Sequence, residues 1–251
     1  MHRQLSPLGY ADGNPVTIER TRARWKPQAL LALILLLVNS TFAQKEIVLH
    51  TFSDFTTGET PVGVIFDRAG NIVGATSWGG IQNCSPEPGC GTIFELVKTS
   101  KGWRHKLLYT FQGGLDGDNP QGELVLDRAG NLYGTTVWGG PVGGGTVFEL
   151  SPSKDGWTES IIHSFGEDHD GGNPSGGLTL GADGSMYGSA LWGGAHGAGA
   201  IYKLTHSKTG WDESIIYSFG ANNQDGAGPQ GQPIFDSHGD LYGATNWGGQ
   251  R

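Results

Sequence analysis

Apolar and polar residues alternate in short runs along residues 44–251, and turn residues interrupt the runs at regular intervals. An alternation of period two is typical of half-buried β-strands, and no segment after residue 43 shows a convincing helical period. Many turns contain Asp-x-x-Gly followed by a short polar residue, a combination that favours tight hairpins because glycine accepts positive φ. The pattern predicts an all-β chain of many short strands.

The tripeptide Trp-Gly-Gly divides this pattern into four copies of one repeat, beginning at Trp78, Trp138, Trp192 and Trp247 at intervals of 60, 54 and 55 residues. Two apolar runs precede each tripeptide. In the complete copies a Gly-Thr-Val-Phe-Glu-Leu-type run and a run starting at tryptophan follow it. A long sandwich or a β-solenoid could also hold so many strands, but four strands in about 54 residues fit a β-propeller blade best.

The strand inventory has an offset start. Residues 46–52 match the fourth run of a repeat, whereas the last repeat stops after its second run. The total is 15 strands in about 3.5 repeats, one fewer than four blades of four strands require. We expect either four blades closed by the N-terminal strand or a chain truncated within a longer propeller. Asp-Gly and Pro residues after each fourth run, such as residues 116–120, are expected to end the strand.

The first 43 residues predict an export signal with a long basic region. Basic residues between Arg20 and Lys26 precede the apolar run 29–38, and the small residues Thr41 and Ala43 follow. That run is far shorter than the roughly 20 residues of a membrane-spanning helix. We expect cleavage after Ala43, a repeat domain over residues 44–251, and a secreted or cell-surface protein without membrane insertion of the mature chain. An uncleaved anchor or a buried helix is the alternative.

The net charge of the repeat domain limits which partners are expected. Residues 1–43 hold five of the 16 Lys/Arg and two of the 24 Asp/Glu, so residues 44–251 carry 11 basic and 22 acidic groups, a net charge of −11. An acidic surface repels nucleic acid and anionic membranes, and it also favours solubility. We therefore expect no nucleic-acid partner.

Several motifs recur in the same order in the copies: Asp-x-x-Gly-Asn-Leu-Tyr-Gly-Thr-Thr, Gly-Gly, Gly-Thr-Val-Phe-Glu-Leu, and Phe-x-x-x-x-Asp-Gly. Over residues 46–251 this combination resembles the GloVer tandem repeat of exported bacterial proteins. Tyr133, Tyr187 and Tyr242 follow its Tyr-Gly pattern, and Val73 departs from it. The resemblance implies export, often with a C-terminal surface anchor, and no established enzymatic activity. Kelch repeats are a weaker match, although they share the length and a Gly-Gly doublet.

Tryptophans at equivalent positions are the first candidate binding groups. Trp78, Trp138, Trp192 and Trp247 end the second strand of each repeat, so they would form a ring of indoles at one end of a propeller. Indole faces and N–H donors suit sugars, whereas aromatic residues repeated in every blade also wedge neighbouring sheets together. Both interpretations also apply to a second series at the start of the fourth strand: Trp103, Trp157 and Trp211.

Acidic residues after the fourth strand are candidate Ca²⁺ ligands: Asp116, Asp118, Asp168, Asp170 and Asp225. Clustered oxygens suit this cation, but no glutamate stands at the twelfth position of an EF-hand loop. Asx-Gly turns use the same residues for backbone reasons. Apart from this Ca²⁺ hypothesis, no cofactor is expected.

Cys84 and Cys90 are the only cysteines, and both lie in a Pro- and Gly-containing loop of the first repeat. In an exported protein they predict a disulfide. A metal site would need further ligands that are not evident nearby in the sequence.

Catalytic motifs do not stand out. No G-x-S-x-G, HExxH, P-loop or Rossmann signature occurs in a suitable context. Carboxylates across a channel could perform glycoside chemistry, but the sequence gives no distance between them. The leading hypothesis is an exported, non-catalytic propeller that binds polysaccharide or another cell-surface component. The alternatives are an extracellular glycan hydrolase or lyase and a purely structural surface protein.

Overall fold

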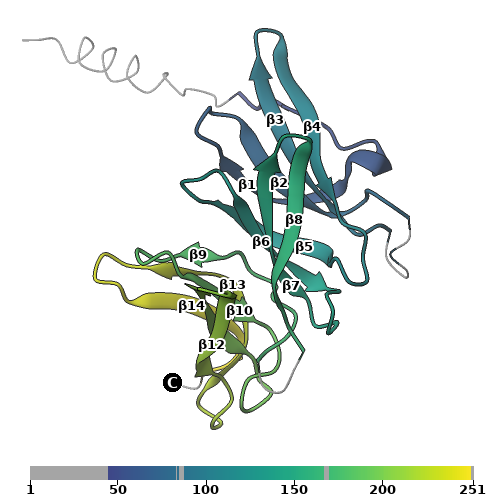
Figure 1. Ribbon diagram of the computed structural model, residues 1–251. Coiled ribbons are helices and arrows are strands. Elements are labelled where there is room, and N and C mark those ends of the chain that lie inside the picture. Colours follow the sequence, from purple (N-terminus) through teal and green to yellow (C-terminus); the bar gives the residue numbers. More distant parts are fainter. Residues whose placement is uncertain (1–44, 83, 85–87, 167–169, 250–251) are drawn as a thin grey trace, which may run out of the picture. The chain divides into compact units, whose positions relative to one another are not determined.

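The computed structural model describes residues 45–249 except 83, 85–87 and 167–169 (Figure 1). The described residues form an all-β structure of 14 strands with one short 3₁₀ helix, η1 (Phe55–Thr57). The expected export signal, residues 1–43, lies outside them. No helix in the described part of the chain has the length and apolar character needed to cross a membrane.

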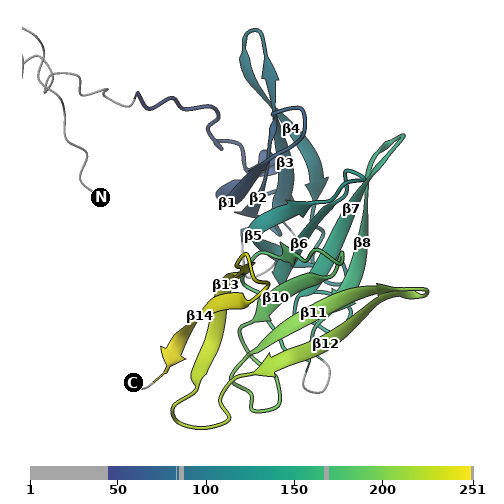
Figure 2. The same ribbon diagram turned by 90° about the vertical axis from the view of Figure 1, so that its left-hand side faces the viewer.

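Three four-stranded antiparallel sheets and one two-stranded sheet follow one another along the chain (Figures 1 and 2). The first contains β1 (Glu59–Phe66), β2 (Ile72–Trp78), β3 (Thr92–Thr99) and β4 (Gly102–Thr110). The second contains β5 (Asp118–Leu126), β6 (Leu132–Trp138), β7 (Thr146–Ser153) and β8 (Gly156–Ser164). The third contains β9 (Thr179–Leu180), β10 (Met186–Ala190), β11 (Ala200–Ser207) and β12 (Gly210–Ser218). The last contains β13 (Gly226–Phe235) and β14 (Leu241–Gly248). Each repeat therefore builds one sheet in simple meander order, as the sequence predicts.

Burial differs between the strands of a sheet. In β6 the first five residues are all buried, whereas the first six residues of β8 alternate between exposed and partly buried positions. A strand that is buried on both faces lies between neighbouring layers, and an alternating strand has one solvated face. The second and third strands therefore supply most of the core, and the fourth strand lies at the edge of its sheet.

The hairpin between the first two strands closes with the expected Asp-x-x-Gly turn. In the second sheet the Asp127 carboxylate accepts hydrogen bonds from the backbone N–H groups of Gly130 (2.8 Å) and Asn131 (2.9 Å). Gly130 has a φ of 97°, which a residue with a Cβ rarely adopts. The turn chemistry read from the sequence is thus confirmed.

Aromatic pairs join each sheet to the segment before it. Their ring centroids lie 4.9 Å apart for Phe52–Phe94, 5.1 Å for Phe111–Phe148 and 4.9 Å for Phe165–Tyr202. In each pair the first ring follows or replaces a fourth strand and the second belongs to the third strand of the next sheet. Such edge-on and tilted contacts are favourable arrangements of aromatic rings, so one contact recurs at three junctions.

Two expectations about strand limits are wrong. Residues 45–54 contain no strand, because a strand needs a neighbouring backbone to pair with. Instead Phe52 packs on Phe94, while Ile47 and Val48 are 66% and 70% exposed. Residues 118–120, expected to be turn, begin β5. Pro120 fits there because β5 is the first strand of its sheet and pairs only with β6.

Candidate functional site

The four Trp-Gly-Gly tryptophans lie at the ends of equivalent strand segments. Trp78 and Trp138 are the last residues of β2 and β6, Trp247 belongs to β14, and Trp192 forms an isolated bridge with Gly172. Three of the side chains are about half exposed: Trp138 at 48%, Trp192 at 48% and Trp247 at 52%. Trp78 is more covered. We call Trp138, Trp192 and Trp247 the indole surface.

The glycines after each tryptophan explain why the strand ends there. Gly139 and Gly140 have φ values of 75° and 83°, and the pairs after Trp78 and Trp192 are also positive. Consecutive positive φ angles turn the chain sharply, and glycine adopts them without steric strain. A Cβ on Gly139 would also meet the backbone of Gly117. The chain therefore leaves the strand directly after the ring.

Trp192 and Trp247 stack on each other, with ring centroids 5.7 Å apart and planes inclined by 25°. The contact joins the third sheet to the fourth. A Cβ on Gly228 would overlap the six-membered ring of Trp247, so glycine allows this indole to lie against the backbone of β13. The two indoles form one aromatic platform with solvent-exposed area on each ring.

The second tryptophan series has a different environment. Trp103, Trp157 and Trp211 are partly buried, and each packs against a hydrophobic core cluster. Trp211, for example, lies 6.1 Å from the ring of Tyr133 in the preceding sheet. Trp157 and Trp211 therefore hold neighbouring sheets together, a structural role of repeated aromatic residues, whereas Trp103 packs on residues of the first sheet and Phe52.

A cleft of about 710 Å³ lies between the second and third sheets, and the sequence did not indicate it. Asp127, Tyr133 and Glu149 line one side, and Asp183 and Trp211 the other. The Tyr133 hydroxyl donates to Asp127 over 3.2 Å, and burial raises the pKa of this phenol. The equivalent cleft between the first two sheets is about 250 Å³. Both clefts lie at the same position between successive repeats.

Three of the acidic candidates close the turn that follows each fourth strand. Asp116 accepts from the backbone N–H of Gln112 (2.6 Å) and from the Tyr109 hydroxyl (2.8 Å). Asp225 accepts from Gly220 (3.0 Å) and Tyr217 (3.0 Å) in the same way. Asp170 accepts from Gly166 (3.2 Å) and lies 3.4 Å from the imidazole of His163. Asp168 lies outside the described residues. The three carboxylates belong to separate loops, each with protein donors of its own.

The match to known proteins covers most of the chain. A family model described as the Gloeobacter/Verrucomicrobia repeat matches residues 37–251. The chain belongs to this repeat family. A crystal structure of a protein of unknown function from Dyadobacter fermentans DSM 18053 is similar at 16% identity and a TM-score of 0.43, covering 72% of this chain and 59% of that one. No curated protein matches.

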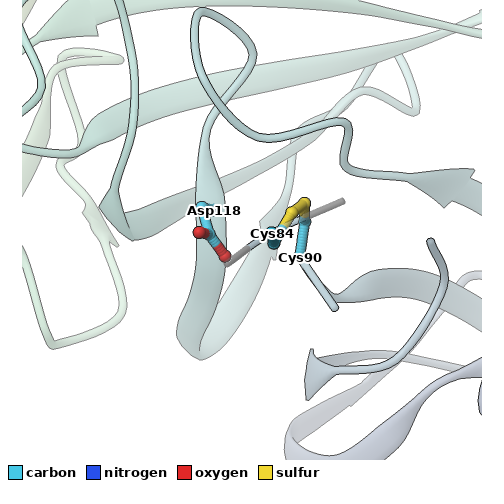
Figure 3. A group of neighbouring side chains, drawn as sticks. All are labelled: Cys84, Cys90 and Asp118. Atoms are coloured by element: carbon cyan, nitrogen blue, oxygen red, sulfur yellow. A yellow bond between two sulfur atoms is a disulfide. The ribbon is translucent and has the colours of Figure 1, made fainter. Parts of the chain in front are cut away.

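In this Gloeobacter/Verrucomicrobia repeat protein Cys84 and Cys90 form a disulfide, with Cα atoms 5.3 Å apart, as predicted (Figure 3). Both residues are buried in a core cluster that also contains Phe111 and Phe148. The backbone N–H of Asn119 donates to the Cys90 carbonyl over 3.0 Å. The disulfide therefore lies in the cysteine loop at the place where the first sheet meets the second.

Asp118 lies beside this disulfide, with ligand-type atoms of the three residues within 4.8 Å of one another (Figure 3). Metal ions bind thiolates, and both sulfurs are bonded to each other here. The group is a carboxylate packed next to a disulfide. Asp118 thus lies beside the disulfide, whereas Asp116, two residues earlier, accepts hydrogen bonds from Gln112 and Tyr109.

Two partly buried glutamates were missed by sequence reasoning. Glu159 and Glu213 stand two residues after Trp157 and Trp211, and burial raises the pKa of each to about 7. Nearby Asp116 and Asp170, respectively, add a smaller upward effect. The repeated Trp-x-Glu spacing was a usable signal, because position two of a strand faces the same side as the tryptophan.

The first sheet has His105 at the equivalent position. Its ring stacks on His50 with centroids 4.6 Å apart, and burial lowers the pKa of His105, with a further lowering by His50. Titratable groups therefore occupy the same place at three junctions between repeats.

Proposed function

We propose that this chain is a non-catalytic binding module of an exported repeat protein, and that the indole surface holds a polysaccharide or another hydroxyl-rich cell-surface component. One observation carries the proposal: Trp138, Trp192 and Trp247 occupy equivalent positions and are each about half exposed. Exposing apolar area to water is unfavourable by roughly 25 cal/mol per Å². Packing within a sheet does not account for the exposed half of each tryptophan.

The chemistry of an indole favours a sugar ligand. The ring offers a flat apolar face for the C–H groups of a pyranose, and its N–H donates a hydrogen bond. The net charge of −11 over residues 44–251 favours a neutral glycan over an anionic one, because like charges repel. The expected export signal would bring the protein to such ligands.

The repeat architecture supports several binding positions. We propose that the four-stranded sheets are blades of a β-propeller, so that the tryptophans ending equivalent strands lie at one end of it. Weak contacts to single sugar units then add up along a polymer through multivalency. Ca²⁺ bound by Asp116, Asp118, Asp168, Asp170 and Asp225 stays a hypothesis, for which a rise in melting temperature on adding Ca²⁺ is the test.

Binding of the full chain to a panel of neutral and acidic polysaccharides tests the function. The double variant W192A/W247A is expected to bind at least about tenfold more weakly, which corresponds to 1.4 kcal/mol. The matched control is Phe66→Ala. It removes an aromatic ring from a residue that is 71% exposed and that ends β1, away from the indole surface. If no glycan bound and the tryptophan variants only lowered the melting temperature, the indoles would be architectural.

A glycan hydrolase or lyase is a second candidate, favoured by one observation. Glu159 has a pKa raised to about 7 and lies near Asp116, and a carboxylic acid with such a pKa suits general acid catalysis. Release of reducing ends from the same panel, compared between the native chain and Glu159→Gln, separates the two functions. Turnover that Glu159→Gln abolishes would favour the enzyme.

A further inference from the structure

The second strand of each complete sheet carries a glycine that receives an aromatic ring from the third strand. A Cβ built on Gly74 would lie 2.8 Å from the Phe94 ring, and a Cβ on Gly134 would lie 2.5 Å from Phe148. A Cβ on Gly188 would overlap the Tyr202 ring. The ring of the third strand therefore occupies the space that a side chain on the glycine would need. We call this space the slot of the glycine.

The fourth glycine of this series has an empty slot. A Cβ on Gly243 would meet no atom within 4 Å. The cleft beside it measures about 490 Å³ and is lined by Phe219, Tyr217, Leu241 and Thr245 among others. Phe219 is the counterpart of Phe111 and Phe165, whose rings pack on the third strand of the next sheet. In the complete sheets the ring of the third strand occupies the equivalent place.

The backbone beside this cleft is also open. Within the described residues β14 pairs with β13 alone, whereas β2, β6 and β10 each pair with a third strand on their other edge. Large apolar side chains are exposed around it, including Ile216 at 47%, Tyr217 at 48% and Tyr242 at 54%. An exposed edge beside an apolar patch is a template for strand addition.

Side-chain pairs across the complete sheets specify what would fit. Thr76 and Thr92 share a hydrogen bond of 2.8 Å between second and third strands, as do Thr136 and Thr146. Thr245 occupies the corresponding place in β14, so a third-strand threonine would fit opposite it. In both sheets the third-strand leucine lies opposite a large apolar residue of the second strand. The third-strand phenylalanine lies opposite the slot glycine, and the threonine lies opposite the second-strand threonine.

We propose that the edge of β14 and its cleft bind the third strand of a further Gloeobacter/Verrucomicrobia repeat. The ligand is an extended segment of the pattern Gly-Thr-(Ile/Val)-Phe-(Glu/Lys)-Leu. It pairs antiparallel with β14, with its leucine opposite Leu241, its phenylalanine in the Gly243 slot against Phe219, and its threonine opposite Thr245. Main-chain hydrogen bonds provide affinity and the slot provides specificity, as in other cases of β-strand addition.

The test uses the full chain and a fluorescein-labelled synthetic peptide with the sequence of residues 145–165, which holds a third and a fourth strand. Saturable binding is expected by fluorescence anisotropy. Replacing the peptide's phenylalanine, the counterpart of Phe148, by alanine should weaken binding at least about tenfold, since a buried aromatic anchor commonly dominates an interface.

Gly243→Val in the chain fills the slot and should abolish binding. Because the slot is empty in the free chain, this variant should keep the native melting temperature, so lost binding cannot be ascribed to unfolding. Absence of saturable binding, or equal binding to Gly243→Val, would overturn the proposal. A homodimer that Gly243→Val dissolves, without any peptide binding, would also overturn it and assign the edge to a second copy of the chain.

Discussion

The junction between the first and second sheets and the junction between the third and fourth are built from the same repeat, yet one is filled and the other is open. At the filled junction Phe111 and Phe148 are both fully buried. At the open junction Phe219 lines a cleft and Gly243 has no neighbour above it. The difference is the third strand, whose ring completes the core that the other strands leave incomplete.

The largest difference in stability between the two junctions is expected when an aromatic ring is truncated at each of them. Phe111→Ala should lower the free energy of unfolding by about 3–5 kcal/mol, because it removes a fully buried phenyl ring and leaves a cavity. Phe219→Ala, which removes the equivalent ring at the partly exposed open junction, should cost about 1 kcal/mol or less. Urea denaturation monitored by tryptophan fluorescence measures both, and equal losses would show that the junctions do not differ.

The disulfide is specific to the filled junction. Replacing both Cys84 and Cys90 by serine should lower the free energy of unfolding by about 2 kcal/mol, the chain-entropy value for so short a loop. Denaturation of the double variant is compared with that of the native chain with and without reductant. The native chain should lose a similar amount on reduction, and the variant nothing. A reductant effect on the variant would rule out this assignment.

Charge at the filled junction predicts a pH dependence. The folded pKa of Glu159 is about 7, above its ordinary value of 4.5, so the folded state holds this proton more tightly than the unfolded state. The contribution of Glu159 to stability is therefore fully present below about pH 4.5 and is lost as the pH rises through 7.

Glu159→Gln should remove that loss. It is expected to stabilise the chain by about 1 kcal/mol at pH 8, a value reduced for partial solvent exposure, and to change little at pH 4. The exposed Glu123→Gln is the control. Thermal denaturation at both pH values decides, and stabilisation of the same size at pH 4 would contradict the titration.

The smallest expected effect belongs to the open junction. Gly243→Val should change the free energy of unfolding by no more than about 0.5 kcal/mol, because the new side chain enters empty space and valine favours strands. The matched variant Gly134→Val meets the Phe148 ring and should cost about 1–3 kcal/mol or more. A large loss in Gly243→Val would mean that the slot is filled in solution.

Much of the fold follows from the sequence because local signals repeat. The alternating runs, the Asp127 turn and the Trp-Gly-Gly spacing each specify a strand or its end, and the disulfide follows from two isolated cysteines. Residues 46–52 show the limit, because they carry a strand pattern but pair with no backbone segment among the described residues. Propensity acts locally, whereas a strand is a property of two segments.

The candidate site was less accessible to sequence reasoning. The Trp138 and Trp157 series look alike as repeated tryptophans, and only the structure separates an exposed ring from a packed one. Asp116 and Asp118 have different surroundings, because Asp116 accepts hydrogen bonds within the turn before β5, whereas Asp118 is the first residue of β5 and lies beside the disulfide. Burial of Glu159 depends on the preceding repeat, which the spacing within one repeat does not reveal.

Amide hydrogen exchange of β14 tests most directly whether the third strand is what separates the two junctions. We expect residues 241–248 to exchange much faster than residues 132–138 of β6 in the free chain, and to become protected when the third-strand peptide is added. Gly243→Val should prevent that protection. Protection of β14 equal to that of β6 without peptide, or no change on adding it, would contradict the account.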